Sequence, residues 1–423
     1  MTLTISQVDG FSIGSLTQTG DGLSSGSESL ADNATSVLNA LDRVSTDWRG
    51  ETQTQAAVRA KDHADSLTER AKRWSSAAAV LRTAADQLGK LRDEILATSE
   101  DMMVRYVCSV ADSGVATVKK SYLDSLAAAN DGDPDGLAAA RAKAFTFAAQ
   151  VTFKLRTLLN TMDVAAQYYD CCVENALLGL GMFPTGAHPF HPRIPPAPAP
   201  PKGPIEDANR DGSGPADYRS YNPSLLEKGY LQGVRAAAEG GAGNAAAGMP
   251  IAAGMLKHFL DNSGEKYRFD VNGMLRDVPK FSDKVQRDAG QSAKSASEVM
   301  PDGYRGPVAF QSAWNPDGDQ GFRADPKQHP DYWAALGTFS YQTSGVYMPN
   351  LGGAGAGPGE LTYQTSIYDY YNWDTTKKSP SEQYSDLNDL HRAGWAQNYE
   401  VTNTSSPQTS MVRQPLAPHS GAH

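Results

Sequence analysis

Apolar residues recur every three or four positions in two long stretches near the start of the chain. The tripeptide Trp48-Arg49-Gly50 separates the two stretches. This spacing places apolar side chains along one face of a helix, and two such faces in succession favour helices that pack lengthwise. The positions are Leu30, Ala34, Val37, Leu41, Val44 and Trp48 before the break, and Ala57, Ala60, Ala64, Leu67, Ala71, Trp74, Ala78, Leu81, Ala85, Leu88 and, slightly out of step, Leu91 and Ile95 after it.

The pattern predicts a long helical hairpin that bends at this tripeptide. Gly50 allows the chain to reverse where a residue with a side chain would be strained. We expect one helix over 27–48 and a second from residue 51 to beyond 103, on the order of 75 Å long. A rod of that length needs a partner along most of it. Residues 1–26 are rich in Ser, Thr and Gly and are expected to be irregular.

A third long helix is predicted over 135–178, after a turn-forming run at 130–134. Its apolar residues again recur at intervals of three and four, which would let it cover the hairpin. These residues are Phe147, Val151, Leu155, Leu158, Met162, Ala165, Tyr169 and Cys172.

The character of the chain changes after residue 182. The proline run over 194–201 cannot be helical, and it predicts an extended, semi-rigid spacer. Two aromatic and Thr/Ser-rich runs, 333–348 and 360–374, are typical of paired strands. Helices over 225–239, 250–260 and 386–395 and a last strand over 398–402 complete the second half.

Together these elements predict a multi-domain protein. It would consist of an all-α helical hairpin or bundle, a Pro-rich linker, and an α+β domain with an antiparallel β core. The predicted boundaries are 1–182 for the helical bundle, 183–220 for the Pro/Gly-rich linker, 221–405 for the α+β domain and 406–423 for a disordered tail.

Composition narrows the functional classes. The net charge of −10 argues against nucleic acid as a partner, since such proteins carry a basic surface. No stretch of eighteen uninterrupted apolar residues occurs, so no transmembrane segment is expected, and the first sixteen residues lack the pattern of a signal peptide. Phosphate loops of the G-x-x-x-x-G-K type and H-E-x-x-H motifs are absent, and we expect no cofactor.

The three cysteines have two interpretations. Cys108, Cys171 and Cys172 lack the C-x-x-C spacing of a metal site. In an oxidising compartment Cys108 could link to Cys171 or Cys172. The alternative is that all three are thiols on helix faces.

With Trp48-Arg49-Gly50 between two heptad-patterned helices, the first ~180 residues resemble the W-x-G class of actinobacterial ESX (type VII) secretion substrates. The opening run over 3–8 is similar to the start of long members that carry a C-terminal effector domain. The resemblance implies export of a folded hairpin without a cleaved signal peptide. It also implies recognition by the secretion machinery or by a helical partner or chaperone.

One departure from that class concerns its Y-x-x-x-D/E motif beyond the second helix. Tyr106 and Tyr169 are each followed four residues later by valine. Tyr370 and Asp374 fit the motif, but they lie in the second predicted domain. The export signal would then come from a partner.

Candidate catalytic residues cluster in the second domain. Asp369, His391 and Arg392 could supply an acid, a base and an anion-binding group. The pattern D-x-Y-N … H-R, with Asn372 at its fourth position, resembles the D-x-Y-D … H-R set of colicin-M-type enzymes, which cleave a lipid-linked peptidoglycan precursor. The alternatives are another catalytic site, or sheet packing of the aromatic residues with Asp369 and Asp374 at a turn.

Three other groups are weaker candidates. Asp207, Asn209 and Asp211 form the first half of a calcium-type loop, but Tyr218 stands where a bidentate Glu is required. The run Asn315-x-Asp317-x-Asp319 is typical of an Asx-type turn. His258, on a predicted amphipathic helix, is interpreted as a structural or helix-end histidine.

The sequence therefore favours a secreted ESX substrate, an interaction or effector protein that acts outside the cytoplasm on a cell-envelope target. It would be cytoplasmic before export and secreted or envelope-bound afterwards. One alternative is a secreted, hydrolase-like enzyme or antibacterial toxin that uses Asp369, His391 and Arg392. Another is an intracellular scaffolding protein.

Overall fold

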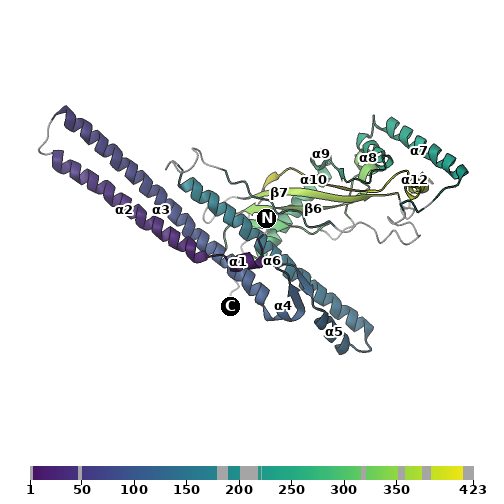
Figure 1. The fold of residues 1–423 in the computed structure, drawn as a ribbon, viewed down its shortest axis with the longest axis horizontal. Coiled ribbons are helices and arrows are strands. Elements are labelled where there is room, and N and C mark those ends of the chain that lie inside the picture. Colours follow the sequence, from purple (N-terminus) through teal and green to yellow (C-terminus); the bar gives the residue numbers. More distant parts are fainter. Residues whose placement is uncertain are drawn as a thin grey trace.

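The computed structural model describes residues 3–45, 50–178, 189–200, 218–220, 222–315, 321–350, 358–373 and 383–412. It confirms the predicted fold class. A helical region that extends to residue 176 is followed by an α+β region whose main sheet is largely antiparallel (Figure 1).

The N-terminal region is dominated by an antiparallel pair of helices. Helix α1 (Ile5–Asp9) leads into α2 (Ile13–Ser45), which packs along α3 (Glu51–Glu100). The pair projects from the rest of the molecule (Figure 1). The predicted seam is confirmed over most of its length, because most alanines of the two stripes are buried, whereas Ala57 and Ala60 are only partly buried and Val44 is half exposed. The buried alanines are Ala34, Ala64, Ala71, Ala78 and Ala85.

The prediction that residues 1–26 are irregular is wrong, because α2 begins at Ile13. Small residues in this stretch let α2 approach α3 closely. A Cβ at Gly26 would overlap the Trp74 ring, and the Ser27 hydroxyl donates to the Ala71 carbonyl at 2.8 Å. Packing against α3 therefore outweighs the poor helix propensity of Gly and Ser.

Two glycines of α2 provide a matched test of this packing. Gly22 faces open space, whereas a Cβ at Gly26 meets Trp74. Gly22→Ala should stabilise the protein by about 1 kcal/mol through helix propensity, and Gly26→Ala should destabilise it because the indole must move. Thermal unfolding followed by circular dichroism will compare them, and an equal rise in Tm for both variants would contradict the packing.

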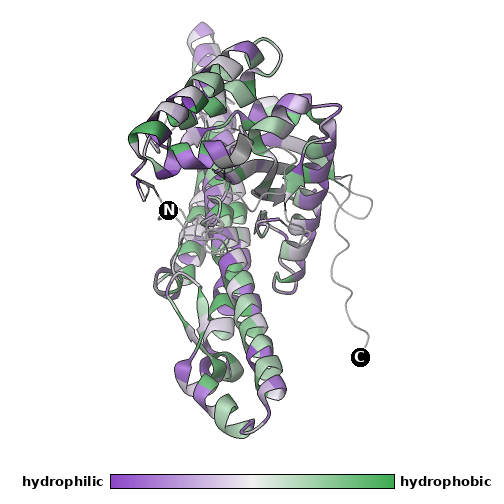
Figure 2. Ribbon diagram, turned by 90° about the vertical axis from the view of Figure 1, so that its right-hand side faces the viewer, coloured by the Kyte–Doolittle hydropathy of each residue, from purple (hydrophilic) through white to green (hydrophobic). Residues whose placement is uncertain are grey.

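Helix α6 (Pro134–Ala176) crosses the base of the hairpin and confirms the third predicted helix. Hydrophobic and hydrophilic residues alternate along the long helices (Figure 2), as expected for helices with one packed face and one exposed face. The core between α3 and α6 includes Leu88, Leu91, Ile95, Leu155 and Leu158.

Between α3 and α6 lie short elements that the sequence pattern does not predict. They are α4 (Met102–Val107), the antiparallel strands β1 (Cys108–Val110) and β2 (Ala116–Val118), and α5 (Lys120–Ala129). None of the three cysteines forms a disulfide bond with another described residue. Cys108 is buried, and this burial raises the pKa of its thiol.

The C-terminal region places one main sheet against helices. The strand order is β3-β8-β7-β6-β4, with β5 also paired to β6 and β9 to β7, and only the β3–β8 pair is parallel. The strands are β3 (Tyr267–Arg268), β4 (Val308–Gln311), β5 (Phe322–Arg323), β6 (Thr338–Met348), β7 (Gly359–Tyr371), β8 (Tyr399–Thr404) and β9 (Gln408–Val412). The helices are α7 (Leu225–Ala245), α8 (Pro250–Leu260), α9 (Val271–Asp277), α10 (Pro279–Glu298), α11 (Pro330–Leu336) and α12 (Gln383–Arg392).

Two predictions in this region are wrong in part. The run 333–348 is not a single strand, because α11 ends only at Leu336 and Gly337, at φ 60°, redirects the chain into β6. Residues 408–412 are not disordered but form β9. Two strands pair with different parts of β7. Strand β8 pairs with positions 366–371, and β9 pairs with positions 359–363.

The edge strand β4 rests on helix α6. The Ala309 backbone N–H donates to the Thr161 hydroxyl at 3.1 Å, and the Asn160 amide donates to the Gln311 side chain at 3.4 Å. Val164 packs into a small core with Ala309 and a valine of β6. The helix therefore covers the backbone of a strand that would otherwise be an open sheet edge.

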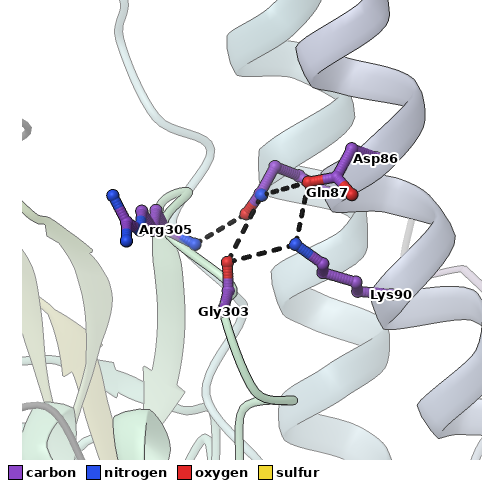
Figure 3. Close-up of polar contacts among 5 residues, drawn as sticks. All are labelled: Asp86, Gln87, Lys90, Gly303 and Arg305. Carbon is purple, nitrogen blue, oxygen red and sulfur yellow. Dashed lines mark hydrogen bonds and ion pairs between the residues drawn. The ribbon is translucent and has the colours of Figure 1, made fainter.

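A second junction joins α3 to the turn before β4 (Figure 3). The Gln87 side chain accepts from the Arg305 backbone N–H at 2.6 Å and donates to the Gly303 carbonyl at 3.4 Å. Lys90 contacts the same carbonyl and pairs with Asp86 at 2.8 Å, and its hydrogen bond holds the pKa of Asp86 below the usual value. Gln87 is only 6% exposed, so its own two hydrogen bonds are partly shielded from water, whereas the Lys90–Asp86 pair is exposed.

Replacement of Gln87 by alanine should leave the Arg305 backbone N–H without its acceptor at a partly buried position. We expect a loss of about 1 kcal/mol in the free energy of unfolding, which is the usual net contribution of one hydrogen bond. Urea denaturation will measure it, with Gln55→Ala as the control because Gln55 is exposed on the same helix. Equal stabilities of the two variants would show that this junction contributes nothing.

Part of the predicted linker, residues 189–200, lies at the first junction, between α6 and β4. These residues form neither helix nor strand. Phe190 packs edge-to-face with Tyr168 of α6 at 5.3 Å between ring centroids, and the Gln311 amide donates to the Pro196 carbonyl. We call residues 189–200 the proline strap. The division into domains at 183–220 stays a prediction, and residues 201–217 lie outside the described residues.

Candidate functional site

The tip of the hairpin is the first candidate site. Helix α2 ends at Ser45 and α3 begins at Glu51, so the helices are interrupted where the sequence pattern predicts. Gly50 caps α3 with φ 122°, a conformation that strains residues with a side chain, and no atom lies near its Cβ direction. Trp48 and Arg49 lie outside the described residues.

The outer half of the hairpin exposes apolar side chains. Leu38, Val44 and Val58 are 43%, 50% and 55% exposed. A shallow groove of about 230 Å³ lies along the first turns of α3, between Thr54 and Arg59. The core shared with α6 begins only near Ala84, so the outer half is a pair of helices with small residues in its seam. Such a surface suits docking of a further helix.

The predicted catalytic residues occupy two elements. Asp369 lies on β7, where its carboxylate accepts from the Tyr370 backbone N–H at 2.9 Å. His391 and Arg392 end α12. The His391 Nδ1 atom accepts from the Asn398 backbone N–H at 3.3 Å, which leaves the proton of the neutral imidazole on Nε2.

His391 belongs to the turn that connects α12 to β8, and several elements converge on that turn. Asn262, after α8, donates to the Gly394 carbonyl at 2.9 Å, and Arg235 of α7 donates to the Trp395 carbonyl at 2.6 Å. The His391 ring is only 3% exposed and lies 5.4 Å from the Tyr218 ring. These contacts give His391 a clear structural role, and its catalytic role stays a prediction.

A cluster of acidic groups lies beside this turn. Burial raises the pKa of Asp389, Arg392 at 3.5 Å opposes the rise, and the nearby Asp386 and Glu227 carboxylates add to it. A carboxylate that is disfavoured by its surroundings is a common feature of functional sites. The ionised form of Asp389 therefore weakens the fold at neutral pH.

Asp389→Asn should raise the Tm at pH 7. The pKa of Asp389 is higher in the folded than in the unfolded protein, so stability falls as pH rises from about 4, the unfolded value, through the folded value. The gain from the substitution should disappear below pH 4, where both states are protonated. Calorimetry over this range will test it, with exposed Asp124→Asn as control. A lower Tm at pH 7 for Asp389→Asn would show that the pair with Arg392 dominates.

The other predicted residues fall into two groups. Asp207, Asn209 and Asp211 lie outside the described residues, as do Asp317, Asp319 and Asp374. Asn315 binds β6, since it accepts from the Tyr341 backbone N–H at 3.1 Å. The His258 ring contacts the Glu265 carbonyl at 2.8 Å and the Tyr399 ring at 4.5 Å. Among the described residues, no group of three or more His, Cys, Asp or Glu side chains could hold a metal ion.

Sequence reasoning missed the cavity between α6 and the proline strap. It has a volume of about 140 Å³, and its walls include Asn160, Asp163 and Val164 of α6. Neither this cavity nor the groove at the tip includes Asp369, His391 or Arg392. The prolines were the available signal, but their composition indicates an extended chain and not the surface that binds it.

Comparisons with protein-family models, with curated proteins and with solved structures gave no match. Within the described part of the chain, no helix is both long enough and apolar enough to cross a membrane.

Proposed function

We propose that the protein is an ESX (type VII) secretion substrate that acts outside the cytoplasm as an interaction or effector protein. The projecting hairpin with its glycine corner is the observation that carries this proposal. A hairpin that stands clear of the body presents its tip and both helices to another protein. The exposed Leu38, Val44 and Val58 supply apolar area for that contact.

In this proposal the two regions have separate roles. The hairpin binds the secretion machinery or a helical partner before export, and the α+β region acts afterwards on a target in the cell envelope. The two junctions with α3 and α6 keep the base of the hairpin fixed while its outer half stays accessible. Recognition of a folded hairpin also fits a protein whose N-terminal residues are already engaged in helices α1 and α2.

Export can be tested with two glycines that both have a positive φ. Gly50 and Gly132 have φ of 122° and 81°, and among the described residues no atom lies within 4 Å of the Cβ position of either. Alanine at either should cost about 1–3 kcal/mol through backbone strain, with the larger cost at Gly50, whose ψ of 179° places it in a region that essentially only glycine adopts. We expect Gly50→Ala to lower secretion from an actinobacterial host several-fold, and Gly132→Ala to leave it unchanged, as measured by immunoblots of culture filtrate and cells.

The same assay in a host without a functional ESX system is the decisive control. The protein should then be retained in the cells. Equal amounts outside cells with and without the system would overturn the proposal. Equal secretion of the two glycine variants would remove the hairpin corner from the recognition step.

A further inference from the structure

The proline strap has the chemistry of a bound peptide. Every residue from 194 to 199 is either a proline or directly precedes one. Proline fixes its own φ, and the residue before it is held in the extended region. This part of the strap is therefore restricted to conformations near polyproline II. That helix has no internal hydrogen bonds, so its carbonyls are available to an outside donor.

Two side chains supply those donors: Gln311, the last residue of β4, and Trp314, which follows the strand. The Gln311 amide donates to the Pro196 carbonyl. The Trp314 indole N–H donates to the Ala199 carbonyl at 3.0 Å and contacts the Pro198 carbonyl at 3.3 Å. The donors and the carbonyls are both three residues apart. Three residues make one turn of polyproline II, about 9 Å, so the two donors meet carbonyls one turn apart along the strap.

The strap does not fill the surface on which it lies. Pro195 is buried, yet the cavity of about 140 Å³ remains between the strap and α6. That volume is several times the ~30 Å³ of one water molecule. The α6 side of the cavity carries the Asp163 carboxylate and the Asn160 amide, and Arg193 of the strap also borders it. A carboxylate in the wall favours a basic side chain as the group that fills the space.

We propose that the surface formed by Gln311, Trp314 and the Asn160–Val164 stretch of α6 is a docking groove for proline-rich extended peptides with a basic residue. The strap occupies it in cis, and a proline-rich segment of a second protein exchanges with it. The seated strap identifies the class of ligand, and the unfilled cavity with its carboxylate identifies the basic residue. This proposal does not depend on export.

Occupancy in cis makes the groove self-inhibited. A tethered segment acts at an effective concentration in the millimolar range, so an external peptide competes poorly with it. A weakened strap should therefore raise the apparent affinity for an added peptide. Removal of the Gln311 or Trp314 donor should lower the affinity of the groove both for the strap and for an added peptide.

The test uses the full chain and a fluorescent peptide with the sequence of residues 189–200. In the strap variant, Pro195, Pro196 and Pro198 are replaced together by glycine, which removes the fixed φ angles. Fluorescence anisotropy should show binding at least about tenfold tighter to this variant than to the wild type. The same peptide with alanine in place of every proline should not bind.

Tryptophan substitutions in the strap variant locate the binding surface. Trp314→Phe should weaken peptide binding by about fivefold, because the indole N–H donor is lost. Trp333→Phe is the matched control, since its buried indole N–H has no hydrogen-bond partner among the described residues. No binding by a folded strap variant, or equal binding after Trp314→Phe, would overturn the proposal.

A second measurement covers the case in which the strap variant does not fold. Wild-type protein labelled with 5-fluorotryptophan gives a fluorine resonance for Trp314, assigned by comparison with Trp314→Phe. Excess proline-rich peptide should shift this resonance and leave that of Trp333 in place. An unchanged Trp314 resonance at saturating peptide would overturn the proposal as well.

Discussion

The outer edge of strand β4 needs a partner, and the arrangement of the two regions depends on how this need is met. A free edge presents unpaired backbone groups, and here α6 covers it through the bond from Ala309 to Thr161. The dependence is mutual. Thr161 is fully buried and Asn160 is 7% exposed. Packing against the sheet removes their polar groups from water, and the hydrogen bonds to β4 replace that lost hydration. The third helix of the N-terminal region is therefore matched to the C-terminal sheet.

The packing of α6 on the sheet determines which part of the hairpin is accessible to another protein. Tyr304 belongs to the cores of both regions, and burial raises its pKa well above the usual value. Together with the contacts of Gln87, it fixes the base of α3 against the turn before β4. Beyond that point, among the described residues, α2 is the element that packs along α3, and the seam contains small residues. The rigid base and the accessible outer half follow from the same packing.

The sequence predicts those elements whose own pattern is strong. Helices α3, α6 and α8 and strand β7 lie close to where the sequence pattern places them, whereas α2 begins at Ile13 instead of residue 27. The start of α2 could not be predicted, because its glycines are helical only through contact with Trp74. Helix α10 was missed for a related reason. Its apolar positions are few, and the polar residue Asp288 is buried because Tyr341 donates to it at 2.6 Å from β6.

The candidate sites show the same division. The spacing of apolar residues locates the corner at Gly50, and the density of polar side chains selects Asp369 and His391. The sequence does not show that the His391 imidazole accepts a hydrogen bond from the Asn398 backbone N–H, since that bond depends on how α12 meets β8. The proline strap is the clearest case. Its conformation follows from composition, whereas its binding surface comes from Gln311 and Trp314, more than a hundred residues further along the chain.

The rigidity of the strap affects the free energy with which it docks on α6 and β4. Because its prolines restrict the unbound chain, docking costs little conformational entropy, and few contacts are sufficient to seat it. Those contacts are two donor side chains, one ring pair at Phe190 and the buried Pro195. By comparison, the bonds of Gln87 join α3 to the turn before β4, and the bond of Thr161 joins α6 to β4 itself. Among the described contacts between the two regions, the strap is therefore the one whose release would break no helix or strand.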